Sequence, residues 1–189
     1  MIYFDNNATT PVAPEVFAAM RPFLESQFGN PSSAYSTGRV ARNAIDDARR
    51  DVAELVGAAN PNEICFTSSG TESDNWAILG ALEANPGKRH IIVTRVEHDA
   101  VRKLCEKLEK NGCRVSWLDV DTDGMLDLAQ LRSELCSDTA VVSTMLANNE
   151  TGILFPVNEI GEIVKSRSDA LFHVDGVNAV GKIPIDLRS

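Results

Sequence analysis

Residues 63–75, Glu-Ile-Cys-Phe-Thr-Ser-Ser-Gly-Thr-Glu-Ser-Asp-Asn, are the stretch around which the rest of the chain is organised. The apolar run Ile64–Phe66 predicts a short buried strand, Thr67–Thr71 predicts a hydroxyl-rich turn, and the pattern becomes helical from Glu72. A helix that begins directly after such a turn offers unpaired backbone N–H groups and the positive end of its dipole. This geometry binds phosphate groups.

Two interpretations of this turn remain open at the level of sequence. The hydroxyls of Ser68, Ser69 and Thr71 are possible additional donors to a phosphate. The same residues also fit an ordinary helix cap, with Thr71 as the capping residue and Asp74 as its acidic partner. Small polar turns before helices are common, so the stretch alone does not decide between them.

Strand-like and helical patterns alternate along the chain beyond this turn. Apolar, β-branched runs predict strands, and apolar residues spaced by three or four predict the helices between them. This order favours an α/β fold in which a mostly parallel sheet is covered by helices on both faces. The predicted strands are Ile64–Phe66, His90–Thr94, Arg114–Leu118, Ala140–Met145 and Leu171–Val174, with helical patterns at residues 76–82, 101–108, 128–135 and 157–164.

Two more helices are predicted before the central stretch. The first begins at Pro14, which suits the start of a helix, and Pro22 is a possible kink or break within it. Gly29–Ser33 is predicted to be a loop, and an amphipathic helix then runs through Ala41–Val56 to a stop at Gly57. No linker or repeat divides the chain, so we expect an N-terminal arm (residues 1–13) followed by one domain (residues 14–189).

Composition and charge limit the classes of function. The 189 residues are 43% apolar and 24% charged, as in soluble globular proteins. A net charge of −9 argues against a nucleic-acid or anionic-membrane surface, although an isolated phosphate pocket is still possible. No apolar run approaches the length of a membrane span, and the first residues are too short and too soon acidic for a signal peptide. We therefore expect a cytoplasmic protein.

The four cysteines show no paired spacing that would suggest a metal site, and no metal ligands are assigned. Without an export signal, they are expected to be reduced and mostly buried. Cys65 is expected in the core of a strand and Cys105 on the apolar face of a helix. All four thiols are therefore interpreted as structural.

Polar residues follow four of the predicted strands. Ligands of parallel sheets gather beyond the carboxyl ends of the strands, so these residues are candidates for a binding site. Each of them alone is more often a cap or a turn former, but four such segments at one edge favour a site. We expect Thr71, His98, Asn149 and Asp175 to converge on one pocket there. The segments are Thr67–Thr71, Glu97–Asp99, Ala147–Gly152 and Asp175–Asn178.

The sequence also resembles a known family. Six segments carry the likeness in unbroken order between about residues 3 and 187, and they resemble the cysteine desulfurases, most closely the nitrogen-fixation branch. These are pyridoxal-phosphate (PLP) enzymes of the class V aminotransferase group, so the resemblance implies a truncated large-domain sheet of the fold type I transferases. The segments begin at Asp5 (DNNATTP), Phe28 (FGNPSS), Phe66 (FTSSGTESDN), Glu97 (EH), Ala147 (ANNETG) and His173 (HVDGVNAVGK).

This resemblance implies roles for six residues. The backbone N–H of Gly70 and the side chain of Thr71 would hold the PLP phosphate. His98 would stack on the pyridine ring and assist proton transfers as a catalytic residue. Asp175 would pair with the pyridine nitrogen and keep it protonated.

The two remaining implied residues are asparagines. Asn149 would lie near the ring hydroxyl or the substrate carboxylate. Asn178 stands where the family usually has a glutamine that contacts the ring oxygen, and its side chain is one methylene shorter. Tyr35 also departs from the family, which often has a histidine in that loop.

The family's Schiff-base lysine and nucleophilic cysteine have no match within these 189 residues, and Lys182 corresponds to a different lysine. The chain is therefore identified as an N-terminal portion that alone neither desulfurates cysteine nor forms the lysine linkage. Alternatives are a fragment of a selenocysteine lyase or class V aminotransferase, or a non-catalytic binding or dimerisation module.

For the whole enzyme, the resemblance implies conversion of L-cysteine to L-alanine with sulfur left as a persulfide on an enzyme cysteine. The persulfide would supply iron–sulfur cluster assembly through a scaffold or another sulfur acceptor protein. Family members are homodimers, so self-association is expected, with Ala8–Thr10 and Gly29–Ser33 lining the interface.

Overall fold

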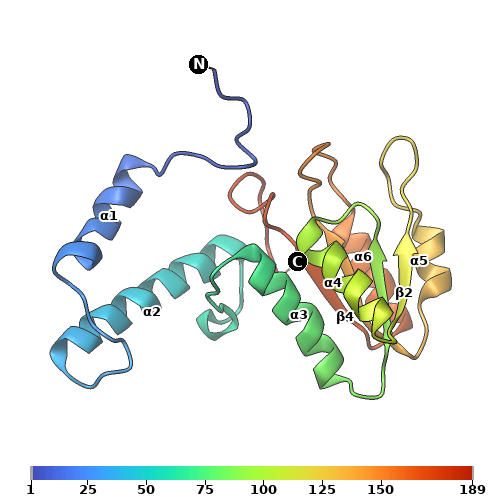
Figure 1. Ribbon diagram of the computed structural model, residues 1–189, viewed down its shortest axis with the longest axis horizontal. Helices are drawn as coiled ribbons and strands as arrows, with labels where there is room; N and C mark the ends of the chain where they lie inside the picture. The colour runs from blue at the N-terminus through green and yellow to red at the C-terminus, as the bar shows by residue number, and fades with distance from the viewer. Residues whose placement is uncertain (1, 189) are drawn as a thin grey trace. The chain divides into compact units, whose positions relative to one another are not determined.

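The computed structural model describes residues 2–188, which form two compact units (Figure 1). One unit contains residues 2–66 and 183–188, and the other contains Thr67–Lys182. The second unit holds the sheet and every residue assigned above to the cofactor site. It is therefore the unit that positions the candidate site.

The sheet of this second unit has four strands, all parallel among the described residues. They are β1 (His90–Thr94), β2 (Arg114–Leu118), β3 (Thr139–Met145) and β4 (Leu171–Asp175), in the spatial order β2-β1-β3-β4. The predicted parallel sheet is confirmed, and the bounds predicted for these four strands differ from the observed ones by at most one residue. Strands β1 and β3 are buried along their whole length because they occupy the centre of the sheet.

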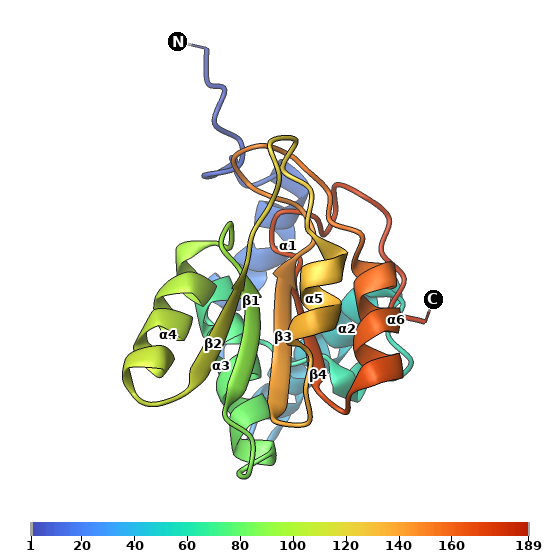
Figure 2. The ribbon, with the colours of Figure 1, turned by 90° about the vertical axis from the view of Figure 1, so that its right-hand side faces the viewer.

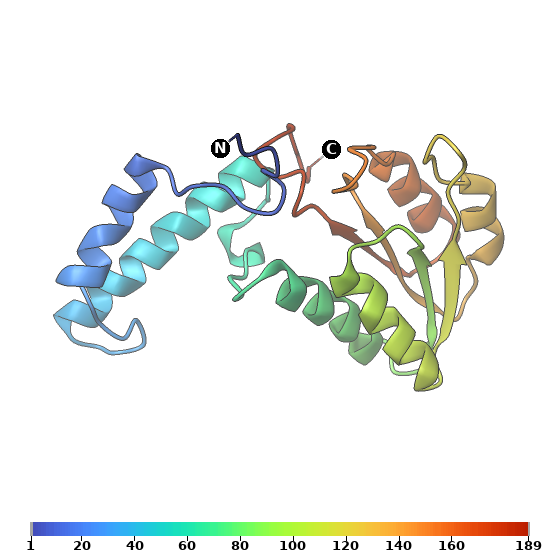
Figure 3. The same cartoon turned by 45° about the horizontal axis from the view of Figure 1, so that its top comes forward.

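Helices cover both faces of this sheet, as predicted. Figure 3 shows α3 (Gly70–Ala84) and α4 (Asp99–Lys110) on one side and α5 (Leu128–Glu134) and α6 (Val157–Arg167) on the other. Alternate residues of a strand point to opposite faces, so Ile91 and Val93 pack on the α3–α4 side while Ile92 packs on the α5–α6 side. Figure 2 shows the four strands side by side. Two apolar layers thus hold the carboxyl ends of the strands at a common edge.

The other unit is built around two helices, α1 (Pro14–Glu25) and α2 (Ser36–Val56), with a short 3-10 turn at Pro61–Glu63. Pro22 lies inside α1 and does not end it. Gly57 ends α2 in the left-handed conformation at φ 71°, and the N–H of Leu187 donates to the carbonyl of Val56. Helix α1 has no buried residue, and its large apolar side chains are exposed.

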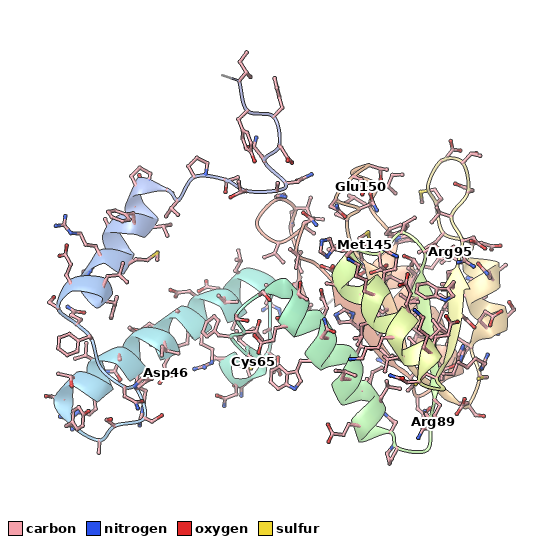
Figure 4. The ribbon with its side chains drawn as sticks, in the orientation of Figure 1. Asp46, Cys65, Arg89, Arg95, Met145 and Glu150 are labelled. Carbon is pink, nitrogen blue, oxygen red and sulfur yellow. The ribbon has the colours of Figure 1, made fainter. Side chains whose placement is uncertain are left out.

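The predicted strand at Ile64–Phe66 is wrong. These residues form irregular extended chain, and Cys65, which was expected in a strand core, is exposed (labelled in Figure 4). The carbonyl of Ile64 accepts a hydrogen bond from Arg49 Nε at 3.2 Å, and the Arg49 guanidinium lies 5.5 Å from the centroid of the Phe66 ring. The segment therefore packs on an arginine of α2. The strand prediction failed because three apolar residues are too few to specify a strand.

The expectation that most thiols are buried is also wrong in part. Cys105 is buried, Cys113 and Cys136 are half-buried, and all four cysteines are free. Desolvation raises the pKa of the Cys105 thiol to about 12, which keeps it protonated and unreactive. No helix within residues 2–188 combines the length and apolar character that crossing a bilayer requires.

Candidate functional site

The site begins at the amino end of α3, where Ser69 is the capping residue. Its Oγ accepts the N–H of Glu72 at 3.2 Å, while the Glu72 carboxylate reaches back to the N–H and hydroxyl of Ser68 at 2.6 and 2.5 Å. The predicted cap at Thr71 with Asp74 as partner is therefore wrong, because the helix starts two residues earlier, at Gly70. The N–H and hydroxyl of Ser68 both donate to Glu72, and the Ser69 oxygen accepts the cap hydrogen bond, which leaves the N–H of Gly70 and the side chain of Thr71 as the donors assigned to a phosphate.

His98 caps the next helix of this face. Its Nδ1 accepts the N–H of Ala100 at 3.2 Å, so a neutral ring carries its proton on Nε2. Thr71 and His98 line one open pocket of about 430 Å³ between α3 and α4. Asn75 ties the two helix starts together, since its Nδ2 lies 2.6 Å from the Thr71 carbonyl and 3.3 Å from the Ala100 carbonyl.

The loop after β3 is fixed by Asn148, which is buried. Its Oδ1 accepts the N–H groups of Glu150 and Thr151 at 3.0 and 2.9 Å, and its Nδ2 donates to the Val96 carbonyl at 3.1 Å. Asn148 therefore ties this loop to the one after β1, and Asn149 lies beside it at the same edge. Met145 and Glu150 mark this end of the sheet in Figure 4, and Arg89 marks the opposite end.

Asp175 ends β4 and is 5% exposed. Its Oδ1 accepts the N–H of Val177 at 2.9 Å, and its carbonyl accepts the N–H of Leu146 at 2.8 Å. Val177 also limits the space at the start of α3, because a Cβ at Gly70 would lie 2.8 Å from Val177 Cγ2. Glycine thus allows α3 to begin close against the turn after β4. Asn178 lies in that turn.

Burial raises the pKa of Asp175, and the nearby Asp74 carboxylate acts in the same direction. Two imidazoles, His173 and His98, and the Val177 N–H favour the carboxylate form instead. Asp175 is thus a buried acid whose charge depends on the cations around it. A cationic ligand at this position would stabilise the carboxylate.

Glu97 is a second buried acid at this edge, and sequence reasoning noted its position without assigning it a role. Its Oε1 accepts the Thr94 hydroxyl at 2.6 Å and the Met145 N–H at 2.9 Å, while Oε2 has no hydrogen-bond partner. Burial raises its pKa to about 7, with smaller contributions from Asp175 and Asp74. The signal that could have found it is an acidic residue in the short segment between the apolar run Ile91–Val93 and the next helix.

Sequence reasoning also missed a polar chain beneath Asp175. His173 Nδ1 lies 2.9 Å from Ser143 Oγ, and its Nε2 lies 3.4 Å from Asp74 Oδ1. Ser143 and Asp74 are buried in β3 and α3. Spacing could not reveal this chain, since its members come from three separate elements.

The structure brings most of the predicted site residues to one edge. Thr71 and His98 line one pocket, and His98 and His173 act electrostatically on Asp175. Asn149 and Asn178 lie in the loops that follow the adjacent strands β3 and β4. The edge differs from the prediction in one respect, since α3 is preceded by extended chain and only β1, β3 and β4 are strands that lead into it.

Comparison with known proteins gives one family and many relatives. Residues 2–189 match the family described as aminotransferase class V. The chain is 52% identical over 189 residues to cysteine desulfurase 2 of Trichormus variabilis, covering 100% of this chain and 47% of that protein. It is 50% identical over 188 residues to the cysteine desulfurase NifS of Azotobacter vinelandii, covering 100% of this chain and 46% of that protein. The chain thus spans about half the length of these relatives.

Solved structures agree with this match. A NifS-like protein superposes with a TM-score of 0.96 at 40% identity, covering 100% of this chain and 52% of that one. A structure described as SspA in complex with cysteine gives a TM-score of 0.93 at 35% identity, covering 98% and 53% of the two chains. The resemblance inferred from the six sequence segments is therefore confirmed, as is the fold class.

Proposed function

We propose, from the premise that this chain belongs to the class V aminotransferase family, that it is the N-terminal portion of a PLP-dependent cysteine desulfurase. Residues 14–189 would be the N-terminal part of its PLP-binding large domain, preceded by an arm of residues 1–13. The observation that carries the proposal is the placement of a helix start, an imidazole and a buried carboxylate at one edge of a parallel sheet.

These residues fit the chemistry of PLP. The start of α3 offers backbone N–H groups and the Thr71 hydroxyl to a phosphate, and the close approach at Gly70 leaves no room for a side chain. Asp175 provides a buried carboxylate for a protonated pyridine nitrogen. When bound, PLP supplies an electron sink that stabilises negative charge on the substrate carbon.

The chain's own residues would divide the remaining work. His98 would lie against the ring and move protons, using the Nε2 that its cap hydrogen bond leaves available. Asn149, on the loop that Asn148 fixes, would contact the ring hydroxyl or the substrate carboxylate. Asn178 would contact the ring oxygen from the turn after β4.

The proposed substrate is L-cysteine, and the proposed product is L-alanine with sulfur held on an enzyme cysteine. The names of the relatives and the cysteine bound to the SspA structure support this assignment. An iron–sulfur scaffold or another acceptor protein would take the sulfur, in a cytoplasmic homodimer. Within these 189 residues, no cysteine or lysine is assigned to the sulfur or Schiff-base step.

The direct test is a PLP titration of the purified chain, followed by fluorescence or absorbance. Weak, reversible binding is expected, and T71A and D175N should each weaken it about tenfold, because each removes a hydrogen bond to a charged group. The matched control is S137A, which removes an exposed hydroxyl at the opposite end of the sheet and should leave the affinity unchanged.

A second arm tests the covalent step. After addition of PLP, reduction with borohydride and digestion, no stoichiometric pyridoxyl-lysine should appear. Equal affinity of the wild type, T71A and D175N would contradict the assigned site. A single fully labelled lysine, or alanine production from cysteine by this chain, would contradict the view that the chain alone is inactive.

A further inference from the structure

We propose that His173 is a positioning residue that keeps the Asp175 carboxylate ionised, held for this task by Asp74 and Ser143. The inference rests on the function proposed above, in which Asp175 binds a protonated pyridine nitrogen. It adds a chain of three residues, none of which was assigned to the site.

The chain is continuous and shielded from solvent. Ser143 Oγ lies 2.9 Å from His173 Nδ1, and Asp74 Oδ1 lies 3.4 Å from His173 Nε2. The side chains of His173 and Asp74 are 14% and 7% exposed, and Ser143 is fully buried. A ring bounded on both nitrogens by buried side chains has one orientation available to it.

The two partners allow the ring to be charged. A carboxylate only accepts hydrogen bonds, so the nitrogen facing Asp74 carries a proton. A hydroxyl can donate or accept, so Ser143 suits Nδ1 with or without its proton. The arrangement therefore accommodates the ring with a proton on one nitrogen or on both.

The position of His173 in β4 directs this charge at the site. Residues two apart in a strand point to the same face, so His173 and Asp175 both face α3, which carries Asp74. An imidazolium there favours the ionised form of Asp175, and His173 acts in this direction on the Asp175 pKa. A carboxylate that stays ionised when buried is what a pyridinium requires.

Other charged groups compete at Asp175. The Asp74 carboxyl from α3 opposes its ionisation and His98 at the start of α4 supports it, while Asp175 itself raises the pKa of Glu97 in the loop after β1. The raised pKa of Glu97, about 7, means that this acid is largely neutral below that pH. His173 lies 3.4 Å from Asp74 and offsets the opposing effect of that carboxylate, and His98 acts on Asp175 in the same direction as His173.

The simpler alternative is that His173 has a purely structural role and only satisfies polar groups in the protein interior. His90 provides the comparison, because it is a buried histidine held by two hydroxyls, Thr139 and Ser116, each 2.9 Å away. It lies at the opposite end of the same sheet, at the first residue of β1. A purely structural role predicts that replacing either histidine affects only the stability of the fold.

The test follows the carboxyl carbon of Asp175 by ¹³C NMR during a pH titration of the cofactor-free chain. H173Q is expected to raise the Asp175 midpoint by about one pH unit, since it removes a nearby positive charge. H90Q is the matched control and should leave that midpoint unchanged. An unchanged midpoint in a folded H173Q, or an equal shift in H90Q, would overturn the proposal.

A wild-type measurement covers the case in which H173Q does not fold. The Asp175 carbon should show a second, smaller inflection at the midpoint recorded on the His173 ring, because interacting groups titrate together. The absence of that inflection would also overturn the proposal. Both NMR measurements use the chain without PLP. Their outcome is therefore independent of the PLP titration, and a failure of this proposal can be distinguished from a failure of the proposed function.

Discussion

The two ends of the sheet are built from similar side chains but handle their polar groups differently. At the amino end, His90 bonds to the hydroxyls of Thr139 and Ser116, and Ser116 in turn donates to Glu134 at 2.5 Å. At the carboxyl end, burial raises the pKa of two acids, Glu97 and Asp175, and Asp175 adds to the rise at Glu97. The polar groups of the amino end are satisfied by protein partners, whereas at the carboxyl end one buried carboxyl oxygen, Glu97 Oε2, has no hydrogen-bond partner.

This difference supports the proposed site at the carboxyl end without reference to any relative. Only two buried side-chain N or O atoms among the described residues lack a hydrogen bond, and they belong to Glu97 and Thr144, on or beside the strands that end there. An unsatisfied buried acid costs stability, so it persists where a ligand or a proton completes it. Among the described residues, no buried side-chain N or O atom at the amino end lacks a hydrogen bond, so we interpret the polar groups there as structural.

The same difference predicts opposite responses to pH. Burial raises the pKa of Glu97 to about 7, so its folded form holds a proton that the unfolded form loses near 4.5, and stability falls as pH rises through that window. Burial and Arg114 lower the pKa of His90 from 6.5 to about 4, so stability is lost as pH falls through that window.

The largest expected effect comes from E97Q, which replaces the acid with a neutral side chain of the same shape. The wild type should lose stability between pH 5 and pH 8, and E97Q should lose about 2 to 3 kcal/mol less over that range. Urea denaturation at both pH values measures the difference. The matched control is E134Q at the amino end, which should keep the pH dependence of stability seen in the wild type. If E97Q also kept that pH dependence, the proposed contrast between the two ends of the sheet would be wrong.

A smaller effect is expected from H90Q at the amino end. Between pH 7 and pH 4 it should lose on the order of 1 to 2 kcal/mol less stability than the wild type, after allowance for solvent screening. Denaturation at these two pH values provides the measurement. The ring signals of His90 offer an independent check, since a wild-type titration midpoint near 6.5 would show that this end is not as desolvated as the structure indicates.

The smallest effect concerns the start of α3, which the carboxyl end depends on for its phosphate donors. S69A removes the hydroxyl that caps this helix and should cost about 1 kcal/mol in thermal or urea unfolding. The control is S133A in α5, whose hydroxyl donates to the Gln130 carbonyl at 2.8 Å and caps nothing. Equal losses in the two variants would mean that the cap at Ser69 has no special role.

Much of this fold was predictable because its signals are local. The runs His90–Thr94 and Arg114–Leu118 became strands with the predicted bounds, and Gly57 ends α2 as expected. Where the signal was weak, the prediction failed. Ile64–Phe66 is too short to specify a strand, and Thr71 was one of several small polar residues that could cap α3.

The sequence by itself determined the alternating α/β order, the family resemblance and the segments that meet at the carboxyl edge. These follow from patterns that repeat over a few residues, and from motifs preserved in order along the chain. Only the tertiary structure decided which side chains become partners: Glu97 reaches the N–H of Met145, and Asp74 reaches His173. Charge and protonation depend on desolvation and on neighbours from other elements, so they are fixed only when distant segments pack together.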